Sequence, residues 1–211
     1  MIKCVQIVNK IWGELQTYKN IIDIINKNDG IITSKEAQEK GISRTMLKKI
    51  NDLGLIERIS QGVYITDKFI YDEYYLFQLK HKNTIFSYNT ALYLQEKTER
   101  TPNKMDITTT KNNSLAYCKD IANVYRVNQN ILELGKIKVK TSTGKTVNAY
   151  NLERTVCDII NNKANIDIET ANKAIKNCIK SKEFNANKMF EYAKKMKVYE
   201  KVKIYMEAII W

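Results

Sequence analysis

Residues 30–65, GIITSKEAQEKGISRTMLKKINDLGLIERISQGVYI, predict two short helices, a tight turn and a β-hairpin. Thr33 or Ser34 stands where a helix N-cap belongs, because a short side-chain oxygen can accept a bond from a free backbone N–H of the first turn. Gly41 is expected to end that helix, and Ser43 to cap the next one. So short a connection forces the two helices to cross steeply, as in a helix-turn-helix unit.

The second half of this stretch predicts a wing. Residues 55–60 and 63–65 have the pattern of strands on either side of Gln61 and Gly62, a turn that needs the freedom of glycine at positive φ. In the second helix, apolar residues recur at helical spacing and are expected to face the core: Met46, Leu47, Ile50 and Leu53. We therefore predict a winged helix-turn-helix.

In such a unit the N-terminal part of the second helix enters the major groove of DNA. Arg44 is then placed to fork onto a guanine, and Thr45 to contact a thymine methyl group or a phosphate. The other residues expected to contact DNA are Ser34, Lys35, Ser43, Lys48 and Lys49 and, on the wing, Arg58, Ser60 and Gln61. The alternative is a winged helix that binds protein, with these lysines forming a solvated face.

The 211 residues carry a formal net charge of +12, which points to a polyanionic partner such as a nucleic-acid backbone. The chain is also rich in Lys, Asn, Ile and Tyr, the bias that an AT-rich genome produces whatever the function, so part of this charge is uninformative. Nothing at the N-terminus resembles a signal peptide, and no apolar run approaches the roughly 20 residues of a membrane span. We expect a cytoplasmic protein without membrane contact.

The segments that flank the winged unit are predicted to be helical. Apolar residues recur every three or four positions over residues 2–25, which favours a helix interrupted at Gly13. The part before Thr17 is expected to pack within the chain, with packing on a second copy as the alternative. Residues 67–80 predict a bridging helix whose aromatic residues form a seam between domains, or else stack on bases.

We expect a winged-helix domain at residues 1–80 and a second domain at residues 82–211. In the second domain, a helix at 88–95 precedes strands at 105–110, 124–127, 137–140 and 145–150, and further helices are predicted at 152–161, 167–180, 186–196 and 199–210. The chain is therefore predicted to be α+β, with a winged helix-turn-helix followed by a mixed α/β domain that ends in a helical bundle.

The residues of known catalytic and cofactor sites are missing from the sequence. It has no glycine-rich phosphate loop, and its lone histidine, His81, has no expected partner. The run from Asp106 to Lys111 lacks the second acidic residue of metal-dependent nucleases. The cysteines, Cys4, Cys118, Cys157 and Cys178, lie far apart and are expected to be buried thiols. We expect no catalytic residue, no metal and no cofactor.

Arg154 and Asp158 are spaced i,i+4 on the helix predicted at residues 152–161. This spacing favours an ion pair on the helix surface or between domains. A contact with a partner molecule is the functional alternative.

Four stretches in order carry a family resemblance: residues 30–65, SYNTALYL at 87–94, ERTPNKMDITTT at 99–110 and NLERTVCDII at 151–160. From about residue 17 to its end, the chain resembles the AbiEi family of antitoxins from bacterial abortive-infection systems, which defend against phage. It departs from the family at Tyr88 and Asn89, where the family usually has an acidic or histidine-bearing helix start.

The resemblance implies two activities for a protein that is not an enzyme. The N-terminal domain would bind inverted repeats in its own promoter and repress the operon, through Arg44, Lys48, Lys49 and the wing. The second domain would counter a nucleotidyltransferase toxin that disables tRNA, in a type IV manner without a stable complex. A monomer in solution that binds DNA cooperatively fits this scheme.

The candidate antitoxin surface comprises Arg154, Asp158, Lys173, Lys176, Lys180, Lys194, Lys195 and Lys201. A lysine-rich face suits tRNA or an acidic toxin surface, and it is equally what an AT-rich genome places on any exposed helix. Two other functions stay open: a winged-helix regulator whose second domain senses a ligand or oligomerises, and an enzyme that acts on the toxin or its product.

Overall fold

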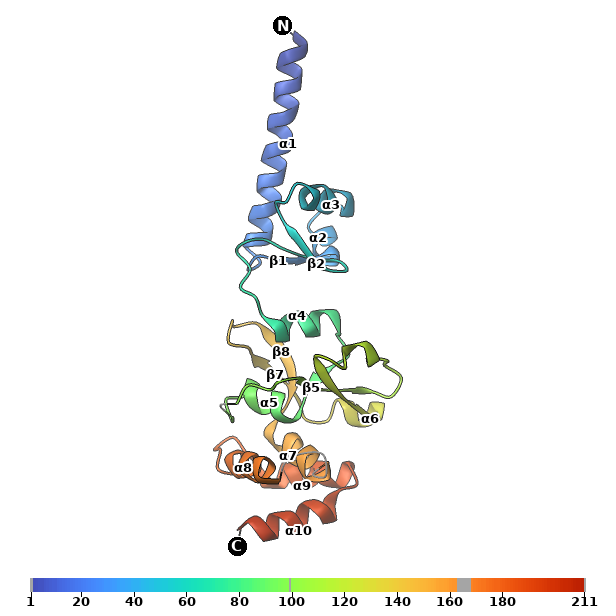
Figure 1. The fold of residues 1–211 in the computed structure, drawn as a ribbon, viewed down its shortest axis with the longest axis vertical. Coiled ribbons are helices and arrows are strands. Elements are labelled where there is room, and N and C mark those ends of the chain that lie inside the picture. Colours follow the sequence, from blue (N-terminus) through green and yellow to red (C-terminus); the bar gives the residue numbers. More distant parts are fainter. Residues whose placement is uncertain (1, 99, 163–167, 211) are drawn as a thin grey trace. The chain divides into compact units, whose positions relative to one another are not determined.

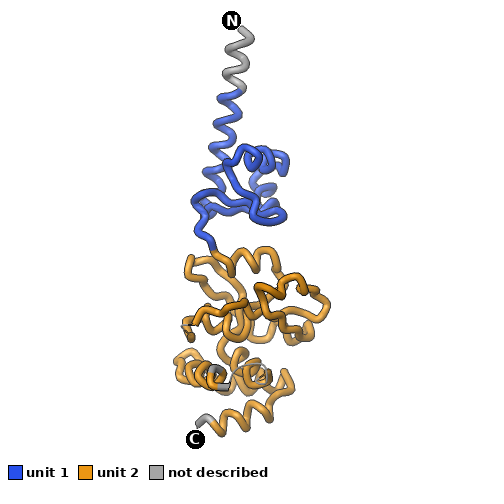
Figure 2. Tube along the Cα trace, in the orientation of Figure 1, with its two compact units in different colours: residues 1–71 blue, residues 72–211 orange. Residues whose placement is uncertain are grey.

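The computed structural model describes residues 2–98, 100–162 and 168–210. The chain forms two compact units, residues 1–71 and residues 72–211, drawn in different colours in Figure 2. Both units combine helices with a β-sheet, so the α+β prediction is confirmed.

The first unit is a winged helix-turn-helix (Figure 1). Its elements are, in order, α1 (Ile2–Asn26), β1 (Ile31–Thr33), α2 (Ser34–Glu39), α3 (Arg44–Asp52), β2 (Glu57–Ser60) and β3 (Val63–Ile65). The strands form an antiparallel sheet in the order β1-β3-β2. Strand β1 was not expected from the sequence, because three residues are too few to show an alternating pattern and, unlike β3, it has no hairpin turn beside it.

Local capping fixes both helices of the helix-turn-helix. The Thr33 hydroxyl accepts a hydrogen bond from the Glu36 amide at 3.2 Å, and the Glu36 carboxylate accepts one from the Thr33 amide at 2.8 Å. Two free N–H groups are satisfied by this capping box. The Ser43 hydroxyl accepts from the Met46 amide at 3.1 Å and starts α3. The predicted caps at Thr33 and Ser43 are confirmed.

The core of the first unit lies between α1, α3 and the sheet. Ile25, Leu47 and Ile50 are fully buried there. Leu53, which was expected to face this core, is 56% exposed, because it follows the last turn of α3 as its C-cap. Gly13 does not interrupt α1, which is one continuous helix.

The described residues of the stripe near the start of α1 are not covered by the core of the first unit, so the expected packing within the chain stays a prediction. Ile11 is 53% exposed, Trp12 68% and Leu15 52%. Further along the helix, Tyr18 and Ile21 belong to the core of the unit. The apolar stripe of α1 therefore continues beyond the core that buries its second half.

The second unit is built on a five-stranded sheet with the order β6-β5-β4-β8-β7. Its elements are α4 (Glu73–Lys80), β4 (Ile85–Phe86), α5 (Tyr88–Leu94), β5 (Met105–Thr110), the 3₁₀ turn η1 (Ala116–Cys118), β6 (Ala122–Val127), α6 (Gln129–Leu132), β7 (Lys136–Lys140), β8 (Thr146–Tyr150), α7 (Leu152–Asn161), α8 (Ile168–Ile179), α9 (Ala186–Lys195) and α10 (Tyr199–Ile210). The sheet mixes parallel and antiparallel pairs.

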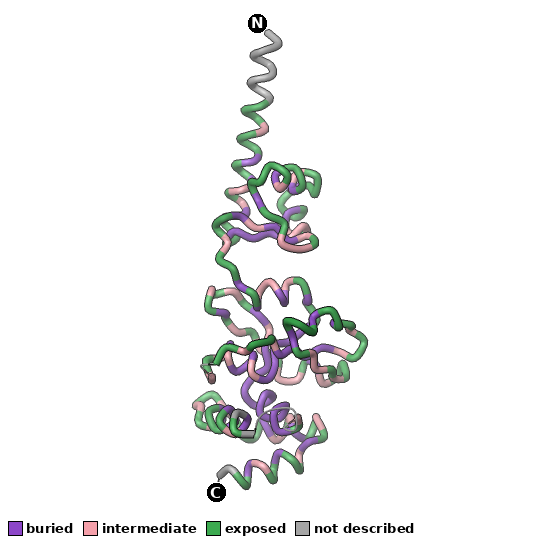
Figure 3. Tube along the Cα trace, viewed as in Figure 1, coloured by how far each residue is buried: buried purple, intermediate pink, exposed green. Residues whose placement is uncertain are grey.

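Helix α7 occupies the centre of the helical part of this unit. Residues 152–160 are all buried, and Figure 3 shows the buried colour concentrated there. Its apolar side chains form one core with α8, α9 and α10, whereas a separate core lies against the sheet.

The helix expected to bridge the two domains is instead part of the second unit. Tyr74 and Phe77 of α4 pack in the core against the sheet, with Tyr74 edge-on to Phe86. Gln78 donates to the Thr84 carbonyl and to the Asn148 carbonyl, both at 3.0 Å, and accepts from the Asn148 amide. The boundary expected at residue 80 therefore lies before α4, between residues 71 and 72.

A glycine allows the chain to pass close to α7. Gly135 has φ of +79°, and its carbonyl accepts a hydrogen bond from the Asn151 amide at 2.8 Å. A Cβ atom at Gly135 would lie 2.5 Å from Arg154 Cβ and 2.8 Å from Asn151 Oδ1. The turn before β7 can therefore contact the start of α7 only without a side chain at this position.

Gly135→Ala is expected to destabilise the second unit more than Gly144→Ala. Both glycines have φ near +80° (+79° and +81°), so alanine carries the same backbone cost of about 1–2 kcal/mol at each. A Cβ at Gly144 meets open space. We expect an additional loss of about 1–3 kcal/mol at Gly135 from overpacking, measured as the free energy of unfolding in urea by circular dichroism. Equal losses would contradict the steric argument.

Candidate nucleic-acid interface

Helix α3 exposes the polar residues of its first turns. Arg44, Thr45 and Lys48 are exposed, while Leu47 and Ile50 on the same helix are fully buried. The buried residues fix the rotation of the helix about its axis, so the expected major-groove contacts lie on its outer side. The arrangement can donate bidentate hydrogen bonds to a guanine edge and place positive charge beside phosphates.

Lys49 is exposed, as expected, and its contact with a phosphate stays a prediction, but its ammonium already has partners within the first unit. Its ammonium lies 3.0 Å from Glu14 Oε2 and 5.4 Å from the centre of the Tyr18 ring. Hydrogen bonding to Tyr18 and to Glu14 raises the pKa of Lys49 above its ordinary value. Both partners belong to α1, so Lys49 joins α3 to α1. Sequence periodicity placed Lys49 outward correctly but did not reveal the neighbouring helix.

The wing and the start of α2 lie side by side. The Ser34 amide donates to the Gly62 carbonyl at 2.7 Å, and Gly62 makes the turn between β2 and β3 with φ of +72°. Lys35, Arg58 and Gln61 are exposed around this junction, and Ser60 is partly exposed. The structure therefore brings the predicted wing residues together with the predicted contacts from α2.

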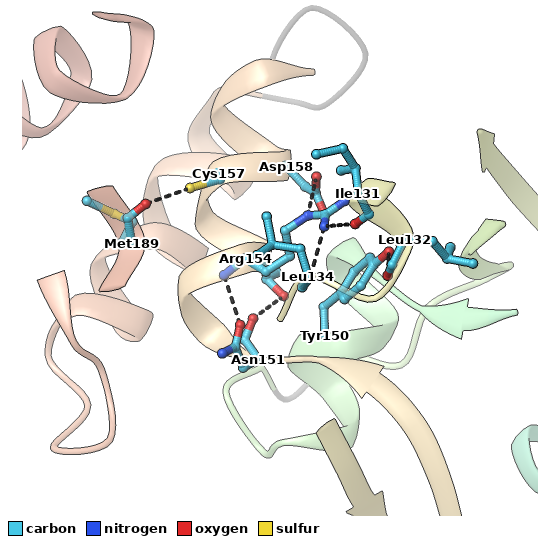
Figure 4. Close-up of polar contacts among 10 residues, drawn as sticks. Ile131, Leu132, Leu134, Tyr150, Asn151, Arg154, Cys157, Asp158 and Met189 are labelled. Atoms are coloured by element: carbon cyan, nitrogen blue, oxygen red, sulfur yellow. Dashed lines mark hydrogen bonds and ion pairs between the residues drawn. The ribbon is translucent and has the colours of Figure 1, made fainter. Parts of the chain in front are cut away.

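Arg154 and Asp158 of the second unit are buried, so their assignment to an exposed antitoxin surface is wrong. Arg154 is 0% exposed and Asp158 6%. The Arg154 Nε donates to both carboxylate oxygens of Asp158, at 3.1 and 3.0 Å, and Nη1 donates to the carbonyls of Ile131 and Leu134, at 2.7 and 2.9 Å (Figure 4). The ion pair is thus neither on the helix surface nor between domains.

The surroundings of this pair are aromatic and apolar. The guanidinium lies 4.2 Å from the centre of the Tyr150 ring. Burial raises the pKa of Asp158 to about 6, with the charge of Arg154 acting in the opposite direction. Among the described residues, Arg154 Nη2 has no hydrogen-bond partner. These features describe an internal brace for α7 and not a surface that recognises a partner.

The lysines proposed for the antitoxin surface are all exposed: Lys173 and Lys176 on α8, Lys180 just past its end, Lys194 and Lys195 on α9, and Lys201 on α10. Lys173 lines a cavity of about 470 Å³ together with Lys97, Arg100, Asn89 and Asn177. Lys97 is also paired with Glu183 at 3.3 Å. Sequence analysis missed Lys97 and Arg100, since loop residues have no periodicity that would connect them to α8.

Asp106 is buried and accepts hydrogen bonds from three groups around it. It is 3% exposed and accepts hydrogen bonds from Asn123 Nδ2 at 2.9 Å, the Asn89 amide at 3.2 Å and the Tyr125 hydroxyl at 3.3 Å. Burial raises the pKa of its carboxyl group. Among the described residues, no three His, Cys, Asp or Glu side chains gather as metal ligands would.

His81 has partners, contrary to expectation. Its ring lies 4.6 Å from that of Phe77, and its two nitrogens lie 3.4 Å from the Tyr117 hydroxyl and 3.8 Å from Cys118 Sγ. Burial lowers its pKa. The three cysteines whose side chains are described, Cys118, Cys157 and Cys178, are buried free thiols, as expected.

We predict that breaking the buried pair destabilises the chain strongly. Asp158→Ala leaves the Arg154 charge without its carboxylate and should cost about 3–5 kcal/mol. The double variant Arg154→Met with Asp158→Leu removes both charges and should recover part of that loss. Urea unfolding of the two variants and the wild type measures both effects. A double variant less stable than Asp158→Ala would argue that the bonds to the Ile131 and Leu134 carbonyls matter more than the charge balance.

Comparisons with known proteins add information on the fold. No family model matches the chain, and no curated protein matches it. The fold is similar to that in the crystal structure of the RV2827C protein from Mycobacterium tuberculosis, with 10% sequence identity, a TM-score of 0.50, and coverage of 88% of this chain and 77% of that one. At this identity the likeness shows the fold alone.

Within the described residues, no helix is both long and apolar enough to cross a membrane.

Proposed function

We propose that this protein is a DNA-binding repressor of its own operon that also acts as the antitoxin of a type IV toxin–antitoxin system. The observation that carries the first half is the set of exposed residues at the start of α3, Arg44, Thr45 and Lys48, in a winged helix-turn-helix. The second half is carried by the resemblance of four sequence stretches to the AbiEi antitoxins.

The geometry favours DNA over a protein partner for the first unit. The outer side of α3 carries Arg44 and Lys48, and the junction of α2 with the wing adds Lys35 and Arg58. The two cationic groups on α3 and the two beside it suit the major groove of DNA, which is flanked by phosphates. The Lys35 ammonium lies 3.9 Å from Glu39, with both side chains mostly exposed, a pair too weakly held to compete with a phosphate.

The antitoxin activity is supported by the second unit, which is compact and has its own hydrophobic cores. Asp72–Trp211 forms one compact unit, so it can act apart from DNA. Its exposed lysines, and the cationic cavity at Lys97, Arg100 and Lys173, suit a phosphate-bearing partner such as tRNA or an acidic protein surface. On this proposal the functional partner is a nucleotidyltransferase toxin encoded beside this gene, with no stable complex between the two proteins and no membrane contact.

Replacing Arg44 and Lys48 together by Ala should abolish specific binding to the promoter. Each lost base contact is worth about 1–3 kcal/mol, so affinity for a promoter fragment with its inverted repeats should fall at least about tenfold. Fluorescence anisotropy with labelled promoter DNA measures the loss. The matched control is Lys27→Ala, an exposed lysine just past the end of α1. If Lys27→Ala weakened binding to the promoter equally, the binding would be nonspecific attraction by the net charge of the protein.

The second unit alone should protect cells from the toxin. We expect a fragment of residues 72–211 to rescue growth when the neighbouring toxin gene is expressed from an unrelated promoter. A fragment of residues 82–211 should fail, because it lacks α4 and with it Tyr74 and Phe77 of the core. Rescue by the full chain alone, with the longer fragment shown to be folded, would place protection in the DNA-binding half and make repression the simpler account.

A further inference from the structure

The cationic cavity of the second unit has the dimensions of a small-molecule site. It lies between α5, the segment that follows α5, and α8, and its volume is about 470 Å³. Sites for small ligands and cofactors measure about 300–1,000 Å³. Leu92 of α5 and Ala174 of α8 line it and are buried. All of these elements belong to one compact unit, so the shape of the cavity is set within that unit.

The rim of the cavity is held by a strained turn. Helix α5 ends at a left-handed residue, Glu96, with φ of +57°. The Glu96 amide donates to the Tyr93 carbonyl at 3.0 Å, and the Lys97 amide donates to the Leu92 carbonyl at 2.9 Å, the two bonds of a Schellman ending. Glycine usually occupies this position, and backbone strain of this kind collects at ligand sites. Asn177 Nδ2 then donates to the Lys97 carbonyl at 3.4 Å and joins the turn to α8.

The charges at the cavity favour an anionic ligand. Arg100 and Lys173 are exposed, and neither forms an ion pair with any residue that the structure describes. Lys97 is paired with Glu183 at 3.3 Å, and Glu96 adds one negative charge to the lining. Two cations therefore border one hollow without a counter-charge bound to them, which attracts anions to it.

The kinds of residue around the cavity suit a nucleotide better than a simple anion. The planar fork of Arg100 can bind a phosphate through two hydrogen bonds, and an AT-rich genome, which enriches lysine, does not explain an arginine. Asn89 and Asn177 line the cavity with carboxamides, which can pair with the edge of a base. Leu92 and Ala174 offer an apolar surface for its face.

We propose that the cationic cavity binds a nucleotide, with the phosphate at Arg100 and Lys173. This inference deepens the proposed function and rests on it for its biological meaning. A nucleotidyltransferase that acts on tRNA has two substrates, a nucleoside triphosphate and an RNA, and both carry nucleotides. An antitoxin that binds one of these substrates can counter the toxin without a stable complex between the two proteins.

The test is a titration of the full-length protein with the fluorescent ATP derivative mant-ATP, followed by anisotropy. We expect saturable binding that ATP reverses and adenosine, which lacks phosphate, does not. Arg100→Ala and Lys173→Ala should each weaken the affinity at least about tenfold, the loss of a hydrogen bond to a charged group. The matched control is Lys176→Ala, an exposed lysine on α8 that does not line the cavity. Absence of saturable binding, or equal weakening by the control, overturns the proposal.

A second variant should bind nucleotide more tightly, which a damaged fold cannot imitate. Glu96→Gln keeps the length of the side chain and removes the negative charge from the lining of the cavity. We expect the affinity for mant-ATP to rise about fivefold, as for one like charge removed from near a phosphate in water. Unchanged or weaker binding by Glu96→Gln contradicts a phosphate at this place.

Competition identifies the source of the nucleotide. A short single-stranded RNA that displaces mant-ATP at lower concentration than ATP does would assign the cavity to the end of an RNA strand. Displacement at lower concentration by ATP would assign it to a free nucleotide. Either result supports the proposal, because the phosphate and base are the same chemistry in both.

The variant with Arg44→Ala and Lys48→Ala separates this site from the DNA-binding surface. Both residues belong to the first unit, so the variant should bind mant-ATP as the wild type does, and a matching loss would move the nucleotide to α3 and overturn the proposal. The antitoxin activity is judged separately by growth rescue. Rescue by residues 72–211 without nucleotide binding refutes the cavity alone, whereas nucleotide binding without rescue refutes the antitoxin activity alone.

Discussion

The Arg154 guanidinium is the group on which the arrangement of the second unit depends. It is fully buried and binds Asp158 on its own helix, the carbonyls of Ile131 and Leu134 on the segment before β7, and the ring of Tyr150 at the end of β8. One side chain thereby joins the helical core to the sheet. Removing a charge of this kind from water is costly unless it is paired, and the bonds from Nε and Nη1 hold α7 where the Asp158 carboxylate and the two carbonyls converge. Gly135 lacks a side chain because Arg154 and Asn151 occupy the space beside it.

Much of the fold could be predicted from the sequence because its signals are local. The caps at Thr33, Ser43 and Asn151 act within one turn of their own helices, and the bounds of β5, α7 and α10 follow from patterns within those segments. The failures share a different cause. Whether α4 belongs to the first or the second unit depends on Gln78 meeting Asn148, seventy residues away. No periodicity within residues 67–80 carries that information.

The residues of the candidate site also divide into those that local sequence patterns predict and those that depend on distant parts of the chain. The exposure of Arg44, Thr45 and Lys48 follows from the helical spacing of Leu47 and Ile50 beside them, so the outer side of α3 was predictable. The engagement of Lys49 by Glu14, the burial of Arg154 and the meeting of Lys97 with Lys173 at one cavity are tertiary facts. A charged residue at i,i+4 from an opposite charge predicts a pair, but the depth of that pair is set by elements elsewhere in the chain. For Arg154 and Asp158, the spacing predicted the pair correctly but not its burial.

The two halves of helix α1 have different surroundings in the first unit. Its second half is part of the core that positions α3, and its first half carries an apolar face that the unit does not cover. Since one continuous helix contains both halves, any molecule that packs on the first half is held in a fixed relation to α3. The second unit has its own cores, so on the proposed function it can bind a different partner while the first unit is bound to DNA.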